Sequence, residues 1–236
     1  MNLNKSTTKV KVRRENVINH NLSTCTRTKT RDEEKRKLTE HKRKLFHLAV
    51  LILPGLLLLG FSREVIVILF TVLVILVFPL EYYRINYPEF FLNQFARKSE
   101  IGRMGTYVPY IIAGYLIYLF FDWRITTYAL LITALGDAGA AIIGTNYGKH
   151  RLPLTKHKSV EGTLAAFGVS FLVILLLALI DRSVIIHPLA MLAPLIVVAT
   201  DFIEAPPHNF LSDNFLNPIL CGLFFWIIGI PPGCAI

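Results

Sequence analysis

One acidic side chain, that of Asp137, lies inside a long apolar stretch of the sequence, Ile125–Gly144. If that stretch is a membrane-spanning helix, Asp137 lies about two helical turns from its end. An ionisable residue at such a depth is rare, normally faces the protein interior and marks a functional site. Gly136, Gly139 and Gly144 would let a second helix approach closely. A packing seam alone would explain these glycines, but it would not explain the aspartate.

A basic loop follows this stretch and ends at Ser159. Its basic side chains are Lys149, His150, Arg151, Lys156, His157 and Lys158. Lysine binds phosphate as a point charge, and the backbone N–H groups of a helix N-terminus bind anions. Ser159 is positioned to cap a helix that begins at Val160, and Gly148 is a turn residue. The loop therefore predicts a site for a polyanion.

The segment from Gly144 to His150 has some likeness to a P-loop, and we exclude that interpretation. Three residues instead of four separate its glycines, and His150 stands where a P-loop has the Ser or Thr that binds magnesium. No strand is expected before it.

Basic residues also precede the first apolar segment, in the pattern Glu40-x-x-Arg43-Lys44-x-x-His47. Arg43 and His47 are four residues apart and Lys44 and His47 are three apart, so on a helix they share one face. Arg and Lys at such a position often serve only to orient the span in the membrane. His47 would lie one turn inside the span, which favours a functional role.

The loop before the last apolar segment is acidic and contains no Lys or Arg; its acids are Asp201, Glu204 and Asp213. Protein-bound Mg²⁺ usually has one or two carboxylate ligands together with phosphate oxygens. The loop therefore predicts a magnesium site. Asp213 or Asn214 could instead, or at the same time, cap the last helix.

The composition is that of an integral membrane protein. Hydrophobic residues make up 53% of the 236 residues, charged residues only 17%, and the mean hydropathy is 0.52. The apolar segments are long enough for membrane helices, whereas a buried strand needs only about 4–8 residues. We therefore predict an all-α polytopic membrane protein with about seven transmembrane helices: Leu45–Phe61, Val65–Tyr82, Thr106–Phe121, Ile125–Gly144, Val160–Ile180, Val184–Phe202 and Phe215–Ile230.

The charge is concentrated before the first apolar segment. Residues 1–44 contain 14 Lys and Arg against 5 Asp and Glu, which accounts for the whole formal net charge of +9. We predict that residues 1–39 form a basic, largely disordered tail attracted to anionic lipid head groups, with no nucleic acid as partner, and that residues 40–236 form the membrane domain. The bias of Lys and Arg between loops places the N-terminus and the polar loops in the cytosol.

Several of these motifs together resemble the CTP-dependent lipid kinases, a family of polyprenol (dolichol), phytol and diacylglycerol kinases. The resemblance covers Glu40 to Trp226. It rests on the following features: Glu-x-x-Arg-Lys-x-x-His, Arg84-Ile-Asn-Tyr-Pro, Gly136-Asp137 followed by Gly-x-x-Tyr-Gly148, Lys158-Ser159-x-x-Gly162, and Glu204 followed by Asp213-Asn214-x-x-x-Pro218.

The resemblance implies transfer of the γ-phosphate of CTP to the hydroxyl of a membrane lipid alcohol, giving CDP and a lipid phosphate. It implies that Asp137 and Asp213 bind Mg²⁺, with Glu204 in support. Lys158 and Arg43 would hold phosphates and Lys44 would assist. The residues that would cradle the nucleotide are Gly136, Gly148, Ser159, Gly162 and Asn214. The general base would be His47 or an acid of the metal group.

Two alternatives remain open from the sequence. Phosphatidate cytidylyltransferases share the Gly-Asp…Lys-Ser-x-x-Gly portion, but they continue with Lys-Asp…His-Gly-Gly…Asp-Arg. This chain has Glu204…Asp213-Asn214 at that place, which favours the kinase. The second alternative is a membrane transporter or scaffold without enzymatic activity. The membrane would be the plasma membrane in a prokaryote and the endoplasmic reticulum in a eukaryote.

Overall fold

The computed structural model describes residues 38–39, 42–44, 48–96, 100–153, 155, 158–181, 187–203 and 210–230. They belong to a compact unit that spans Thr39–Ile236, apart from Leu38. In these ranges every regular element is a helix, and one isolated antiparallel bridge joins Arg151 to Ser159. The predicted all-α class is confirmed for this part of the chain. The basic tail, as well as Glu40, His47 and Glu204, lies outside it.

The described part of each predicted apolar segment is mainly helical. The elements are η1 (Ala49–Leu51), α2 (Ile52–Leu58), α3 (Arg63–Asn86), η2 (Phe91–Phe95), α4 (Tyr107–Phe120), α5 (Trp123–Tyr147), α6 (Val160–Ile180), η4 (Pro188–Leu192), α8 (Ala193–Asp201) and α9 (Asp213–Ile227). The described part of the segment predicted as Val184–Phe202 forms one apolar helix, Pro188–Asp201, which begins as the 3₁₀ helix η4 and continues directly as α8. Each part has a proline at its first or second position, and a proline lacks the N–H group that would continue the α-helical hydrogen bonds.

Within the described residues, three helices are long and apolar enough to cross a membrane: α3, α5 and α6. The helix α4 has 14 residues and α9 has 15. At about 1.5 Å of rise per residue, each covers less than the ~30 Å of a hydrocarbon core. The membrane character is therefore clear from the structure, while the count of seven spans stays a prediction.

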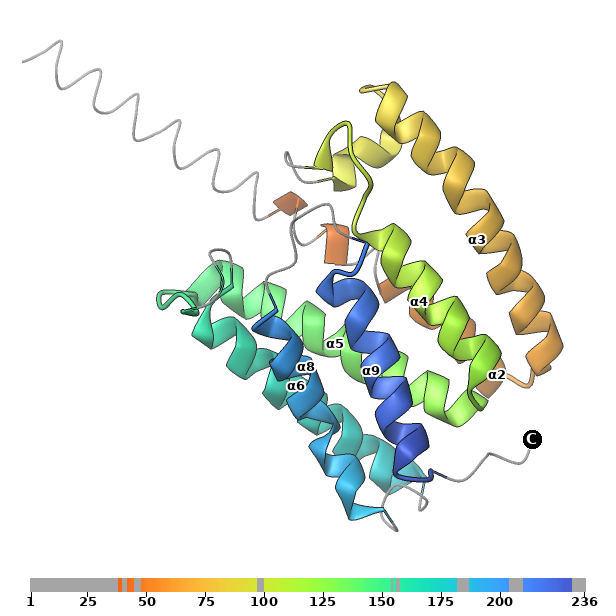
Figure 1. The fold of residues 1–236 in the computed structure, drawn as a ribbon, viewed down its shortest axis with the longest axis vertical. Coiled ribbons are helices and arrows are strands. Elements are labelled where there is room, and N and C mark those ends of the chain that lie inside the picture. Colours follow the sequence, from red (N-terminus) through yellow and green to blue (C-terminus); the bar gives the residue numbers. More distant parts are fainter. Residues whose placement is uncertain are drawn as a thin grey trace, which may run out of the picture. The chain divides into compact units, whose positions relative to one another are not determined.

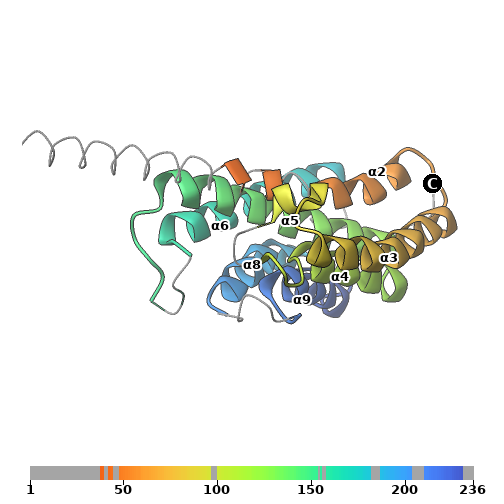
Figure 2. The same ribbon diagram turned by 90° about the horizontal axis from the view of Figure 1, so that it is seen from above.

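The helices α5 and α6 form the closest pair, and α4, α8 and α9 lie across them in a second layer (Figures 1 and 2). A Cβ atom added at Gly139 of α5 would come within 2.7 Å of Val169 of α6. One added at Gly162 of α6 would lie 3.0 Å from the carbonyl oxygen of Ala140. The predicted close approach at the small residues is thus confirmed.

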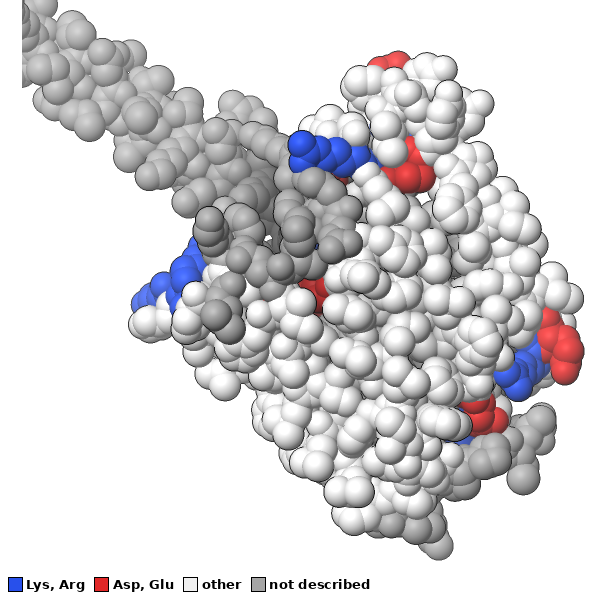
Figure 3. Space-filling model, in the orientation of Figure 1, with Lys and Arg blue, Asp and Glu red and all other residues white. Residues whose placement is uncertain are grey.

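Charged side chains lie near the two ends of the helices. On the face shown in Figure 3, uncharged residues cover the middle of the helices. At the end where α5 begins, Arg63 donates to the carbonyl oxygens of Tyr118 and Phe121, both at 3.2 Å, and Arg124 lies 3.4 Å from Asp181. The opposite end carries the side chains that the sequence singled out.

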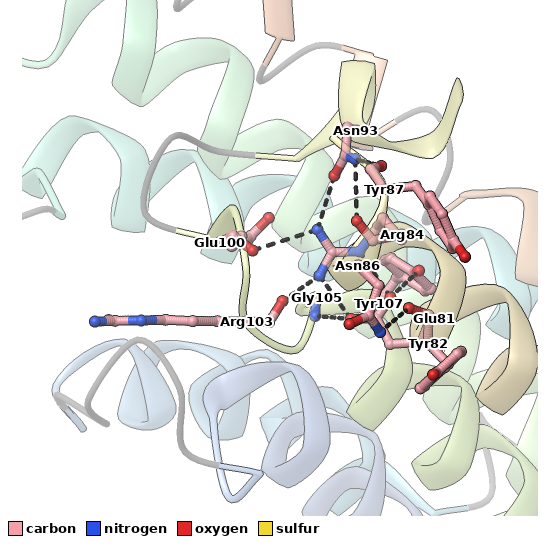
Figure 4. Close-up of polar contacts among 10 residues, drawn as sticks. All are labelled: Glu81, Tyr82, Arg84, Asn86, Tyr87, Asn93, Glu100, Arg103, Gly105 and Tyr107. Atoms are coloured by element: carbon pink, nitrogen blue, oxygen red, sulfur yellow. Dashed lines mark hydrogen bonds and ion pairs between the residues drawn. The ribbon is translucent and has the colours of Figure 1, made fainter. Parts of the chain in front are cut away.

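The loop between α3 and α4 is held by a buried pair, Glu81 and Arg84, at the end of α3 (Figure 4). Arg84 is only 1% exposed, and its guanidinium donates two hydrogen bonds to the Glu81 carboxylate, at 2.6 and 2.7 Å. It also donates to the carbonyl oxygens of Glu100 (3.3 Å) and Arg103. A planar guanidinium with several fixed donors suits this task, because it can bind a carboxylate and backbone oxygens at once.

Glu81 completes the attachment of the loop. Its carboxylate accepts the backbone N–H of Gly105 at 2.6 Å and the hydroxyl of Tyr107, the first residue of α4. Asn93 in η2 accepts from Arg84 at 3.3 Å and donates to its carbonyl oxygen at 3.0 Å. The pair therefore positions the start of α4, where Thr106 contacts Arg43.

Candidate functional site

Lys44 and Asp137 form an ion pair, although 93 residues separate them in the sequence. The Lys44 side chain is 8% exposed and that of Asp137 is 30% exposed. The neighbouring Arg43 is also buried, and it donates to the hydroxyl of Thr106, immediately before α4, at 3.0 Å. The structure therefore brings three of the predicted site residues together at one end of the bundle.

Lys158 binds two carboxylates from two other helices. Its ammonium lies 2.9 Å from Asp201, the last residue of α8, and 2.9 Å from Asp213, the first residue of α9. Burial acts to lower the pKa of Lys158, but the carboxylates of Asp213 and Asp201 outweigh it, so the pKa lies above its ordinary value. Lys158 is thus firmly cationic at neutral pH.

These two groups of charges form one cluster. Asp137 also interacts electrostatically with Lys158, and Asp213 interacts with Asp137 and Lys44. The members of this site cluster are Arg43, Lys44, Asp137, Lys158, Asp201 and Asp213. Three cations and three anions balance one another, so no net charge is left in an apolar setting, where it would be costly.

The basic loop folds back on itself before α6. Leu152 donates to the carbonyl oxygen of Lys158 at 3.2 Å, and Val160 donates to that of His150 at 2.9 Å. Ser159 accepts the N–H of Gly162 at 3.2 Å, so the predicted cap of this helix is confirmed. The N–H groups of Val160 and Gly162 are therefore already paired, and binding of phosphate by this helix terminus stays a prediction.

The glycines predicted to cradle the nucleotide lie where helices or loops come close. A Cβ atom at Gly148 would meet Ser159 at 2.6 Å, and one at Gly136 would collide with Ser170 and lie 3.4 Å from Ala166. The small size of Gly136 and Gly148 is therefore needed for packing, while their contact with a nucleotide stays a prediction.

Gly162→Ala is expected to destabilise the protein, because the new methyl group would lie 3.0 and 3.2 Å from backbone atoms of Ala140 and Gly144. Backbone atoms of a packed helix cannot swing away as a flexible side chain can, and overpacking typically costs about 1–3 kcal/mol. Gly168→Ala in the same helix is the matched control, since nothing lies within 4 Å of its Cβ position. The midpoint of thermal unfolding in detergent checks the pair; equal midpoints would contradict the expected overpacking.

The start of α9 differs from one expectation. The sequence allows Asp213 or Asn214 as the cap of the last helix, but the cap position belongs to Ser212, whose side chain makes no capping hydrogen bond. Asp213 instead accepts the N–H of Asn214 at 2.9 Å and pairs with Lys158. A carboxylate in the first turn is still favourable for the helix dipole.

Asp137 and Asp213 suit Mg²⁺ in the type of their donor atoms, because this ion prefers carboxylate and phosphate oxygens. Next to Asp213, the Ser212 hydroxyl is buried and has no hydrogen-bond partner within the described ranges. The same ranges contain no group of three or more His, Cys, Asp or Glu side chains arranged to hold an ion. In donor type the two carboxylates would suit an ion that also has phosphate ligands, and binding of Mg²⁺ here stays a prediction.

The sequence does not single out Thr163 as a site residue, and it gives Asp201 only as one of three acids in a loop, without a role of its own. Thr163 lies one turn into α6 and donates to Asp201 at 2.9 Å. Asp201 also closes an apolar segment, and that position was the available signal for its role. The predicted His47 and Glu204 lie outside the described residues.

Comparisons with known proteins point to one group of enzymes. The chain is 31% identical over 101 residues to the CTP-dependent diacylglycerol kinase 1 of Saccharomyces cerevisiae, and this alignment covers 40% of this chain and 35% of that protein. It is 37% identical over 89 residues to the dolichol kinase of the same organism, and this second alignment covers 38% of this chain and 17% of that protein. The chain thus spans little more than a third of the length of the first relative and less of the second.

No family model matches the chain, and no solved structure matches it either. Both curated relatives carry the word kinase in their names, and one name specifies CTP. Over the part of the chain that they cover, the matches confirm the resemblance that the sequence motifs predicted.

Proposed function

We propose that this protein is a CTP-dependent lipid-alcohol kinase, which transfers the γ-phosphate of CTP to the hydroxyl of a membrane lipid. The observation that carries the proposal is the site cluster, in which cations and carboxylates alternate at one end of an apolar helix bundle. A triphosphate with its metal ion matches both signs: its phosphates pair with the lysines and the arginine, and the ion pairs with the carboxylates. The relation to two lipid kinases supports the same activity.

Phosphoryl transfer depends mainly on positioning and on neutralising the charge of the triphosphate. In our proposal Lys158 and Arg43 hold the phosphates and Lys44 assists them. Asp137 and Asp213, with Glu204, hold Mg²⁺, which when bound neutralises phosphate charge. An acid of this group, or His47, accepts the proton of the lipid hydroxyl.

The acceptor is a lipid alcohol, either a polyprenol such as dolichol or a diacylglycerol, and these are the substrate types in the names of the two relatives. It reaches the site sideways from the bilayer, between helices. The site faces the cytosol, in the plasma membrane of a prokaryote or the endoplasmic reticulum of a eukaryote. The basic tail contacts anionic head groups.

An assay with labelled CTP tests the proposal. Purified protein is mixed with Mg²⁺, with each of several lipid alcohols or phosphatidate, and with CTP labelled at either the α or the γ phosphate. Label that reaches a lipid alcohol from the γ position is the expected result. Transfer of the α label to phosphatidate would indicate a cytidylyltransferase instead, and no transfer with CTP or any other common nucleotide would exclude both enzymes.

Lys158→Ala is expected to lower the transfer rate by about 10²–10³-fold, because it removes a cation that would neutralise the charge of the triphosphate. The variant also leaves Asp201 and Asp213 without their shared partner, so membrane insertion and thermal unfolding are measured beside the rate. Lys149→Ala in the same loop is the control, since Lys149 is exposed. A Lys158→Ala protein with the wild-type rate would remove this residue from the proposed site.

A further inference from the structure

Asp201 is held by both of its carboxylate oxygens. Oδ1 lies 2.9 Å from the ammonium of Lys158, and Oδ2 accepts a hydrogen bond of 2.9 Å from the hydroxyl of Thr163. The residue is only 9% exposed. A buried carboxylate with both oxygens occupied by the protein has little freedom to turn toward a ligand.

Its surroundings are fixed as well. Thr163 is 7% exposed and lies in α6, where its N–H donates to the carbonyl oxygen of Ser159 at 3.0 Å. Thr200, the residue before Asp201 in α8, donates its hydroxyl hydrogen to the side chain of Asn217 in α9. Asp201 is therefore tied to α6 directly, and its own helix is tied to α9.

Asp213, the other carboxylate on Lys158, is held less firmly. Its side chain is 29% exposed, compared with 13% for that of Asp201. One of its oxygens accepts the N–H of Asn214 in its own helix at 2.9 Å, and the other pairs with Lys158. Breaking that single pair is enough to free Asp213 from the loop, whereas freeing Asp201 would also break the bond to Thr163.

We propose that the two carboxylates divide their tasks: Asp201 is a positioning residue that keeps Lys158 aimed at the triphosphate, while Asp213 leaves Lys158 to bind the metal ion. The inference rests on the proposed function. A lysine is a point charge on a flexible stem, and ordering it at the moment of binding would reduce affinity. Because Asp201 stays paired with Lys158 when the metal ion binds, it keeps the lysine side chain ordered before the triphosphate arrives.

The first test separates nucleotide affinity from metal dependence. Thr163→Val preserves the shape of the side chain but removes the hydroxyl, and Asp201→Asn removes the charge. Each is expected to raise KM for CTP about tenfold, with a smaller change in kcat and no change in the Mg²⁺ concentration needed for half-maximal rate. Thr163→Ser, which restores the hydroxyl, is expected to return KM to the wild-type value. Asp213→Asn is expected to show the opposite pattern, with a raised Mg²⁺ requirement.

The second test needs no activity. Without nucleotide, the amino group of Lys158, in its neutral form, attacks an amine-reactive ester and displaces the leaving group to give an amide. The modified peptide is quantified by mass spectrometry across a range of pH. Asp201→Asn and Thr163→Val are expected to speed acylation of Lys158 several-fold, while the exposed Lys149 reacts at the same rate in all variants. Mn²⁺ binding, measured by electron paramagnetic resonance, is expected to weaken in Asp213→Asn and to stay unchanged in Thr163→Val.

Failure of the proposed kinase function and failure of the proposed division of tasks give different results. If wild-type protein transfers no phosphate from CTP, the proposed function fails, and acylation together with Mn²⁺ binding still decides the division of tasks. Unchanged acylation in Asp201→Asn would overturn the inference. So would faster acylation with an unchanged KM for CTP, because Asp201 would then hold Lys158 without serving the nucleotide. Loss of Mn²⁺ binding in Thr163→Val would overturn it too.

Discussion

Asp137→Asn is expected to lower phosphate transfer by about 10³-fold or more while the protein still inserts into the membrane, because the change removes the charge that would bind the metal ion and keeps the shape of the side chain. Asp137 faces Lys44 and interacts electrostatically with Lys158, so it lies at the centre of the site cluster. The rate with labelled CTP, normalised to folded protein, is the measurement.

Two further variants make this result specific. Asp137→Asn leaves Lys44 charged, buried and without its carboxylate, so part of any loss could reflect stability; adding Lys44→Met in the same chain removes that charge. If the double variant is as stable as wild type and is less active than Lys44→Met alone, the further loss belongs to Asp137 and not to stability. Asp181→Asn, at the opposite end of the bundle, is the matched control and is expected to keep the wild-type rate. Full activity of Asp137→Asn would contradict its role in the site.

Arg84→Met is expected to destabilise the protein by about 3–5 kcal/mol, the effect of leaving one member of a buried ion pair without its partner. Glu81 would keep its bonds from Gly105 and Tyr107, but the carbonyl oxygens of Glu100 and Arg103 would lose their donor. Thermal unfolding in detergent measures the change. Limited proteolysis is expected to cleave first in the loop between α3 and α4, because that loop depends on the pair.

The pairwise contribution follows from a double-mutant cycle with Glu81→Leu and Arg84→Met. Replacing both members by apolar residues of similar size is expected to cost less than the sum of the single changes, because no buried charge is left alone. Asn86→Ala is the control on the same helix, since its side chain donates only to the carbonyl oxygen of Tyr82 and is exposed. If Arg84→Met unfolds at the same temperature as Asn86→Ala, the proposed structural role of Arg84 is contradicted.

The helices could be predicted because membrane helices depend on a local property, the length of an apolar segment. The cap at Ser159 is local as well, since the serine and the helix start that it caps are adjacent in the sequence. The sequence did not predict the change of helix type from η4 to α8, which coincides with the positions of two prolines. Hydrophobicity alone does not register such a change.

The site was predicted as a set of residue types but not as a set of contacts. Nothing in the sequence relates Lys44 to Asp137, because their pairing depends on how helices that lie far apart in the chain pack. The same holds for Thr163, whose hydroxyl meets Asp201 only because α6 packs against α8. An isolated threonine in an apolar helix has no distinguishing pattern until that packing is known.

The order of the pair Lys44 and Asp137 along the chain has a consequence for biosynthesis. A lone aspartate at the centre of a membrane helix opposes insertion by about 2.5–3.5 kcal/mol. Since Lys44 is translated 93 residues before Asp137, we expect its ammonium to lie at the membrane surface by the time α5 enters the bilayer. The counter-charge therefore precedes the charge that it neutralises, and we expect α5 to insert beside a partner for Asp137 that is already present.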